Sequence, residues 1–210
     1  MILKVLPVGP IETNCYIFGC ENTMRGAVID PGDEPKRLIE AIKESGLSID
    51  YIFLTHCHFD HMMGLEEVAQ YTGAPVVVCT SDTPIWESTK RYLLKSGKID
   101  QARQPDVWAK EGDTFNVGDM KCTWMNTPGH TVGSSCILTG DTIFSGDTLF
   151  YIECGRCDLD TGNYSEMLKS LKRLALLEGD YAVYPGHGQS SRLSFERKHN
   201  PYMKEGLEQK

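Results

Sequence analysis

The stretch Thr55–Gly64, THCHFDHMMG, gathers three of the chain's six histidines, with a carboxylate and a thiol between them. It continues the apolar run IDYIFLT, which predicts a buried strand leading into the cluster. Side chains at i and i+2 of an extended segment share a face, so His56 and His58 can converge on one ion. Asp60 and His61 follow in a turn and can reach a second point nearby. The stretch therefore supplies two ligands to each of two sites, and each site needs further partners.

Three further polar residues lie in glycine-rich turns directly after apolar runs: His130 in NTPGHTVGS, Asp147 in FSGDTLF and His187 in VYPGHG. Loops that follow strands are where a scaffold presents ligands at a shared rim. Each of these residues alone is consistent with a structural role, but together they supply the missing partners. Imidazole and carboxylate ligands suit zinc, iron and manganese alike, so the residue types do not choose the metal.

The rest of the chain alternates short apolar runs with helical patterns. Apolar or β-branched runs predict strands at residues 2–8, 15–18, 27–29, 49–55, 74–80, 114–117, 121–126, 135–138, 142–144 and 181–188. Amphipathic periods predict helices at 34–45, 64–71, 164–177 and from about 191 onward. The polar segment 81–106 shows helical character only around 91–95 and has no clear period.

The order of these elements indicates a doubled architecture, because each half is a group of strands followed by a helix, a strand and a histidine. Two sheets stacked face to face, with helices outside, would bury both sets of strands. We therefore expect an α+β fold, a four-layer αββα sandwich of two packed mixed sheets with helices on the outside. We expect residues 1–210 to form a single domain, since this length lies within the range of one large domain.

Composition argues against several classes of partner. The net charge of −8 and pI near 5.2 disfavour binding to a phosphate backbone, so we expect no nucleic-acid partner. No run approaches the roughly 18 apolar residues of a membrane helix, and the apolar start has neither a basic leader nor a cleavage site. Eight scattered cysteines are too few for a disulfide scaffold. We expect a cytoplasmic protein with no membrane partner, in which Cys57, Cys154 and Cys157 are ordinary thiols.

These motifs, in this order, resemble the metallo-β-lactamase-fold hydrolases and, within them, the glyoxalase II-like (hydroxyacylglutathione hydrolase-like) branch. The resemblance runs through DPG at Asp30, THCHFDHMMG against the family's T-H-x-H-x-D-H-x-x-G, PGHTVGS, SGDTLF, GRCDLDTGNYSEMLKSL and YPGHG. It covers nearly the whole chain. Its motifs are specific for the fold and for metal binding, and much less specific for the substrate.

The resemblance implies a binuclear centre. It assigns three ligands to each metal and one bridge between them: His56, His58 and His130; Asp60, His61 and His187; and Asp147. Asp30 matches an acidic position that supports one of these ligands, a role suited to fixing the tautomer of an imidazole. We expect two divalent metal ions, zinc first, with iron and manganese as the alternatives.

The reaction that the resemblance implies is hydrolysis, in which a metal-activated hydroxide attacks a thioester of the S-lactoylglutathione type or a related small-molecule ester. Two divalent ions lower the pKa of a bound water from 15.7 to about 7. Asp60 would orient this nucleophile and manage its proton, and Asp147 would hold the two ions together. Arg156, in ECGRC, matches a stretch in which the family places a basic residue beside glutathione, so it is a candidate substrate contact.

The chain also departs from the full-length glyoxalase II pattern. Those enzymes carry a helical C-terminal domain that binds glutathione, whereas only 23 residues follow His187, so we expect no such separate domain. One alternative is a mononuclear iron persulfide dioxygenase, which is similar in sequence, and another is a lactonase or phosphodiesterase of the same fold. Zinc β-lactamases place a cysteine at the second metal, whereas this chain has Asp147, which disfavours antibiotic hydrolysis.

Overall fold

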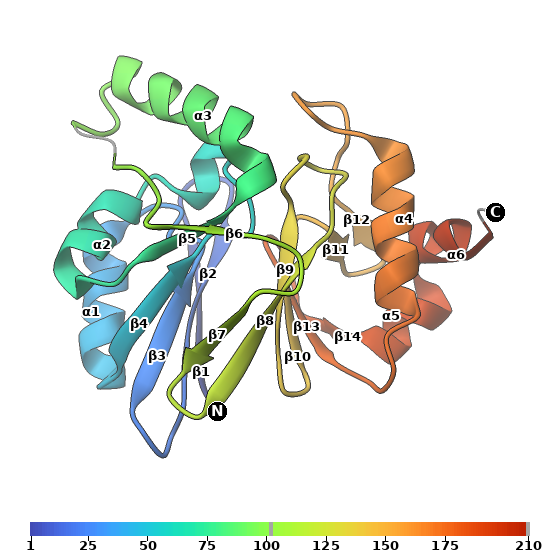
Figure 1. The fold of residues 1–210 in the computed structure, drawn as a ribbon, viewed down its shortest axis with the longest axis horizontal. Helices are drawn as coiled ribbons and strands as arrows, with labels where there is room; N and C mark the ends of the chain where they lie inside the picture. The colour runs from blue at the N-terminus through green and yellow to red at the C-terminus, as the bar shows by residue number, and fades with distance from the viewer. Residues whose placement is uncertain (101–102, 209–210) are drawn as a thin grey trace.

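The computed structural model describes residues 1–100 and 103–208 and shows four layers (Figure 1). Two six-stranded sheets face each other in the middle, and helices cover the outer side of each sheet. The predicted α+β, four-layer αββα sandwich is therefore confirmed.

The first sheet holds the strands of the N-terminal half in chain order. They are β1 (Ile2–Val8), β2 (Thr13–Gly19), β3 (Arg25–Ile29), β4 (Ser48–Phe53), β5 (Val76–Cys79) and β6 (Val107–Ala109). Strands β1 to β3 pair antiparallel, whereas β3 to β6 pair parallel. Parallel neighbours need a crossover, which α1 (Pro35–Ser45), α2 (Leu65–Thr72) and α3 (Thr83–Lys95) provide on the outer face.

The second sheet repeats this plan in the C-terminal half. Its order is β14 (Ser191–Arg192), β13 (Ala182–Pro185), β10 (Thr142–Gly146), β9 (Ser135–Thr139), β8 (Met120–Asn126) and β7 (Thr114–Val117). Only β10 and β13 pair parallel in this sheet, and α4 (Tyr164–Ala175) lies between them in the chain. A small hairpin of β11 (Leu149–Phe150) and β12 (Glu153–Cys154) precedes α4, and α5 (Leu193–His199) and α6 (Pro201–Glu208) close the fold.

Strict alternation in the strands produces the layers. In β2, Tyr16 and Phe18 enter the core between the sheets, while Cys15 and Ile17 enter the core beneath the helices. All four are buried, so β2 is apolar on both faces. On the other side of the molecule, α4 packs Leu168 and its neighbours against the outer face of the second sheet. The rims, where the strands end, are left to carry polar residues.

Several elements differ from the sequence prediction. Helix α3 starts at Thr83, well before the predicted helical region, and Pro84 occupies its first turn. The sequence did not predict this start because the buried Thr89 masks the apolar period. The predicted C-terminal helix is divided, since Pro201 begins a new helix after Asn200. Strands β6, β11, β12 and β14 were not predicted because each has only two or three residues, and β14 occupies the first two positions of the predicted C-terminal helix. Residues 101–102, inside the poorly predicted polar segment, lie outside the described residues.

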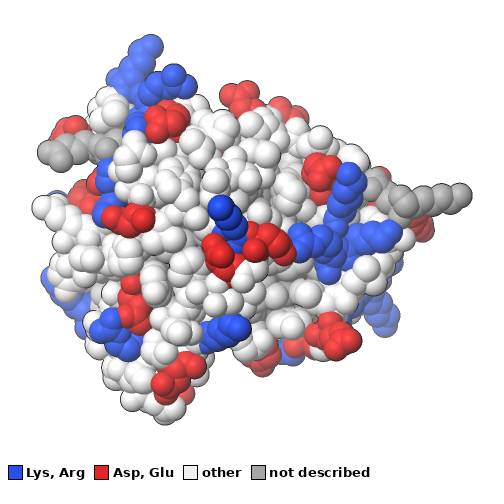
Figure 2. Space-filling view, viewed as in Figure 1, with Lys and Arg blue, Asp and Glu red and all other residues white. Residues whose placement is uncertain are grey.

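The surface carries mixed charge. Figure 2 shows Lys and Arg interspersed with Asp and Glu on the face it presents, separated by uncharged surface. Among the described residues, every helix is too short or too polar to span a bilayer.

Candidate metal centre

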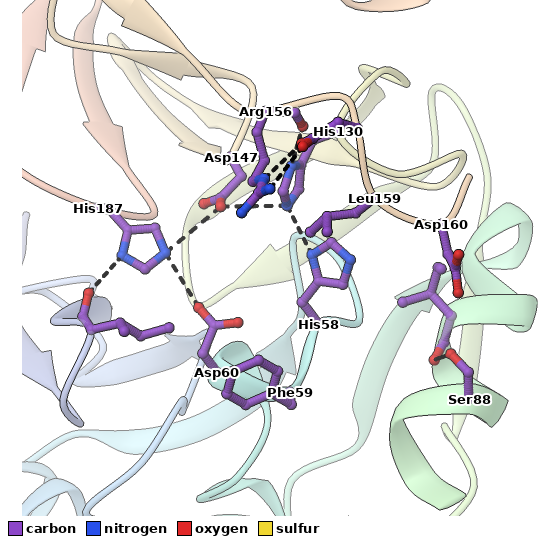
Figure 3. Close-up of a pocket in the computed structure, with 13 residues that line it drawn as sticks. His58, Phe59, Asp60, Ser88, His130, Asp147, Arg156, Leu159, Asp160 and His187 are labelled. Atoms are coloured by element: carbon purple, nitrogen blue, oxygen red, sulfur yellow. Dashed lines mark hydrogen bonds and ion pairs between the residues drawn. The ribbon is translucent and has the colours of Figure 1, made fainter. Parts of the chain in front are cut away.

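The residues singled out in the sequence meet at one rim of the two sheets. The stretch after β4 contributes His56 and His58 and then the 3₁₀ turn η1 (Phe59–His61) with its Asp60 and His61. The remaining members come from loops of the second half: His130 after β8, Asp147 after β10 and His187 after β13. Figure 3 shows side chains from both halves pointing toward one another across this rim.

The first group of donors consists of His56, His58 and His130. Their nitrogen atoms lie within 4.8 Å of one another. His58 Nδ1 lies 2.8 Å from His130 Nε2, and the His56 ring stands edge-on to both neighbouring rings. The predicted strand ends at Phe53 rather than reaching Thr55, yet His56 and His58 still face the same side.

The second group consists of Asp60, His61 and His187, again with donor atoms within 4.8 Å of one another. The Nε2 atoms of His61 and His187 each lie 3.3 Å from Asp60 Oδ2. Asp147 stands between the groups, because its Oδ1 is 3.5 Å from His61 Nε2 and its Oδ2 is 3.5 Å from His130 Nε2.

Three buried donor atoms at this rim have no hydrogen-bond partner: His56 Nε2, His61 Nε2 and Asp147 Oδ1. Leaving a buried polar atom unpaired costs about 1–3 kcal/mol. His56, His61 and Asp147 also form a third donor group, with ligand atoms within 4.8 Å of one another, so cations bound in the cluster would satisfy these atoms. The histidine and aspartate groups therefore fit a metal site.

Hydrogen bonds on the side away from the cluster fix the tautomers of three imidazoles. His130 Nδ1 donates to the Arg156 carbonyl at 2.7 Å, His187 Nδ1 to the Ile11 carbonyl at 3.1 Å, and His61 Nδ1 to Asp30 Oδ2 at 2.9 Å. Carbonyl and carboxylate oxygens only accept, so the proton of each ring lies on Nδ1 and the Nε2 lone pair faces the cluster. This is the orientation that metal-binding histidines need.

Burial and neighbouring charge set the ionisation of the cluster. Burial, reinforced by His130, lowers the pKa of His58 to about 4, so this ring is neutral at pH 7. Burial alone would raise the pKa of Asp60, but the electrostatic attraction of His61 and the close approach of His187 hold that pKa well below its usual value. For His61, burial opposes ionisation, yet Asp60, Asp30 and Asp147 raise its pKa. The carboxylates therefore favour positive charge at the centre.

Asp30 supports the second group from outside the cluster through several hydrogen bonds. Its carboxylate is 1% exposed and accepts from Thr55 N, Thr55 Oγ1 and His61 Nδ1. Thr55 Oγ1 also lies 3.2 Å from His56 Nδ1. One buried carboxylate thus orients a donor in the second group directly and one in the first group through a threonine.

Two positioning residues were missed in the sequence. Thr13 Oγ1 donates to Asp60 Oδ2 at 2.9 Å from the start of β2. Asp82, at the end of the 3₁₀ turn η2 (Thr80–Asp82), accepts from Cys57 N at 2.7 Å and from Gly133 N at 3.1 Å. It thereby ties the loop of His56 and His58 to the loop of His130. Neither residue belongs to a local motif, so only the tertiary structure reveals its role.

Asp82→Ala is expected to lower the free energy of unfolding by about 2–6 kcal/mol, because two buried N–H groups lose their acceptor at about 1–3 kcal/mol each. Burial already raises the pKa of this carboxyl, but its hydrogen bonds offset that cost. Urea unfolding of the metal-free protein measures the loss. Ser81→Ala, at the exposed neighbouring position, is the control and should change stability by less than about 0.5 kcal/mol. Equal stability of the two variants would contradict the role given to Asp82.

A cavity of about 630 Å³ opens over the cluster, within the usual size range of ligand sites. Arg156 lines it, but its guanidinium makes two hydrogen bonds to Asp158, at 2.7 and 2.8 Å.

Cys57 is buried in the helix-side core, where burial raises the pKa of its thiol. Burial likewise raises the pKa of Cys154 to about 12 and, less strongly, that of Cys157. None of these three thiols belongs to the donor groups found among the described residues.

Gly186, in the YPGHG turn, shows why the rim needs a glycine. A Cβ atom at this position would overlap Asp147 Oδ1 and crowd the His61 ring. The backbone there also pairs with the first half, since Gly186 O accepts from Asn14 N at 2.7 Å. The loop carrying His187 can therefore approach the other donors only without a side chain.

A four-layer αββα sandwich with histidine and aspartate groups at one rim defines the class, and the sequence agrees. The chain belongs to the metallo-beta-lactamase superfamily, whose sequence profile matches residues 8–187.

Among its relatives, the "Probable metallo-hydrolase YqgX" of Bacillus subtilis is 34% identical over 94% of this chain and 95% of its own. The "Hydroxyacylglutathione hydrolase GloC" of Haemophilus influenzae is 30% identical over 97% and 98%.

Solved structures agree with this placement. TTHA1623, in a di-iron-bound form, superposes with a TM-score of 0.84 at 31% identity, over 95% of this chain and 99% of that one. BLEG-1, described as a B3 metallo-beta-lactamase, superposes with a TM-score of 0.83 at 30% identity, over 96% and 99%. Relatives named for different substrates are thus equally similar to this chain. The family and the fold follow from the comparisons, whereas the metal and the substrate have to be argued from the donor groups and the cavity.

Proposed function

We propose that this protein is a binuclear metal-dependent hydrolase that cleaves thioesters, with S-lactoylglutathione as the first compound to test. The observation that carries the proposal is the set of buried, unpartnered atoms of His56, His61 and Asp147 at the centre of two donor groups. The relative named as a hydroxyacylglutathione hydrolase supports the choice of a thioester.

In this proposal His56, His58 and His130 would hold one ion, and Asp60, His61 and His187 would hold the other. Asp147, which lies between the two groups, would serve both. Zinc is the first choice, and iron and manganese are the alternatives; the di-iron form of TTHA1623 supports iron. Bound there, two divalent ions supply a water of lowered pKa and polarise the substrate carbonyl.

The chain's own residues orient the attacking water and assist its deprotonation. Asp60 is ionised, since its pKa is held low, so its carboxylate accepts a hydrogen bond from the attacking water and aims it. Thr13 holds Asp60 in this position by donating to Oδ2. Hydrolysis forms a C–O bond and breaks the C–S bond; one proton of the water ends on the leaving thiolate and the other is released as the product acid ionises. Arg156, at the rim of the cavity, is a candidate contact for a carboxylate of the leaving thiol.

Thr13→Val keeps the shape of the side chain and removes the bond to Asp60. Loss of such a supporting partner typically weakens metal binding by 10–100-fold. We expect about a tenfold weaker affinity for one of two ions, measured by competition with a chromophoric chelator. Thr23→Val, at an exposed threonine, is the matched control and should bind both ions as the parent does. Unchanged affinity in Thr13→Val would remove Thr13 from the site.

The test of the proposed function is a metal count followed by a substrate panel. Two ions per chain and release of thiol from S-lactoylglutathione are expected. The panel also holds a lactone, a phosphodiester and a β-lactam, the last because a 30% identical relative is described as a β-lactamase. One iron per chain, with dioxygen consumed in the presence of glutathione persulfide, would replace the hydrolase by a persulfide dioxygenase.

A further inference from the structure

We propose that the substrate carries an apolar acyl group, which binds to a collar of large hydrophobic side chains around the mouth of the cavity. The collar consists of Ile11, Phe59, Ile85 and Leu159, all of which line the cavity above the donor groups. The inference rests on the proposed thioester hydrolysis and specifies which acyl group that reaction accepts.

The collar is assembled from distant parts of the chain. Ile11 lies in the turn between β1 and β2, Phe59 in η1 and Ile85 in α3, while Leu159 follows the β11–β12 hairpin. Figure 3 shows Leu159 above His58 and Phe59 below Asp60, so that His58 lies between the two apolar side chains in this view. A group entering toward the donors therefore passes between apolar side chains.

Three of the four collar side chains are unusually accessible for their type. Ile11 is 50% exposed, Leu159 41% and Phe59 39%, whereas Ile85 is buried. Clustered exposed hydrophobic residues that surround a polar centre are typical of ligand sites, because a bound apolar group removes their surface from water. The collar is continuous with the candidate metal centre, so its occupant is part of the molecule that reacts there.

The charged residues of the cavity offer little to a polyanionic substrate. Among the described lining residues outside the donor groups, Arg156 is the cation, and it is already bonded twice to Asp158. Asp160 adds a further negative charge to the same rim. A carboxylate of the leaving thiol would reach Arg156 only in place of Asp158, whereas an apolar acyl group would bind to the collar without breaking an ion pair.

A series of thioesters with one leaving group tests this directly. Acetyl, butanoyl and hexanoyl thioesters of N-acetylcysteamine share an uncharged thiol and differ only in methylene groups. Complete burial of a methylene is worth about fourfold in binding, and a half-open collar should give about half that free energy, or about twofold per methylene. We expect kcat/KM of the fully metal-loaded enzyme to rise about fifteenfold from acetyl to hexanoyl.

Variants of the collar residues test whether these side chains cause the preference for longer acyl groups. Ile11→Ser and Leu159→Ser should each lower the hexanoyl-to-acetyl ratio of kcat/KM at least threefold, and metal content and urea unfolding verify that the site is intact. Ile11 keeps its backbone carbonyl, which holds His187, in the serine variant. Leu176→Ser is the matched control, because Leu176 is 65% exposed and lies outside the cavity lining. Its ratio should equal that of the parent.

The outcomes separate this inference from the proposed function. The inference is supported if the parent has a hexanoyl-to-acetyl ratio of kcat/KM well above one and only the collar variants lower this ratio. Hydrolysis that does not increase with chain length, or a ratio that the collar variants leave unchanged, overturns the inference and leaves a thioester hydrolase. No hydrolysis of any thioester, S-lactoylglutathione included, by enzyme holding two ions per chain overturns both.

Discussion

Asp147→Ala is expected to remove most of the bound metal and to lower hydrolysis by about a thousandfold or more. Asp147 is the side chain that stands within 3.6 Å of donors in both groups, so its loss separates the two halves of the centre. Metal ions contribute several kcal/mol to stabilising charge in a hydrolytic transition state, and about 4 kcal/mol corresponds to a thousandfold in rate.

The measurement is metal content by mass spectrometry together with thioester hydrolysis. Asp141→Ala is the matched control, since Asp141 is an exposed aspartate in the turn between β9 and β10, away from the donors. It should keep two ions and full activity. An Asp147→Ala protein that holds two ions and hydrolyses the substrate normally would rule out the bridging role.

Asp30 is expected to give the second large effect, on both stability and metal binding. Asp30→Ala leaves three buried donors without their acceptor, so the free energy of unfolding should fall by about 3–5 kcal/mol. Asp30 also has a positive φ of 50°, which aspartate tolerates better than alanine. Asp30→Gly relieves this backbone strain and thus separates the side-chain loss from the conformational one.

Asp30→Asn provides the sharper comparison for the metal. The amide keeps the shape and one accepting oxygen, so we expect it to be less destabilising than alanine. Its NH₂ group would face His61 Nδ1 and favour the tautomer whose proton points into the cluster. Metal affinity should therefore fall 10–100-fold, although most of the stability is retained. Isothermal titration of metal into each variant measures this, and tight binding by Asp30→Asn would show that the His61 tautomer is set elsewhere.

Much of the fold could be predicted because the strands and main helices alternate in clear periods. The donors of THCHFDHMMG could be recognised because they are neighbours in the sequence, and His130, Asp147 and His187 because each follows an apolar run. Helix α3 was largely missed, since its buried face includes Thr89 and its exposed face includes the hydrophobic Tyr92 and Leu94, which together obscure the apolar period. The role of each donor in binding an ion stays a prediction until metal content is measured.

Apart from Asp30, which the family resemblance pointed to, the supporting contacts could not be predicted, and the reason is physical. The Thr13–Asp60 bond joins residues 47 positions apart, and Gly133 and Asp82 are 51 positions apart. The Arg156 and Ile11 carbonyls that orient two imidazoles are backbone atoms, which any residue would provide. Sequence patterns report which side chains face a core, but not which backbone oxygen ends beside a ring.

The placement of the donors at the junction of the two halves has a consequence for the lifetime of the protein. Four donors follow β4 of the first sheet, and three follow strands of the second. Each donor group therefore combines residues from both halves, and neither half alone carries a complete group. Ions bound there would act as reversible cross-links between distant segments. Separating the halves would then require release of the metal first, so the metal-loaded protein should owe its persistence to a slow unfolding step rather than to equilibrium stability alone. Chelators would shorten that persistence by acting on a rate.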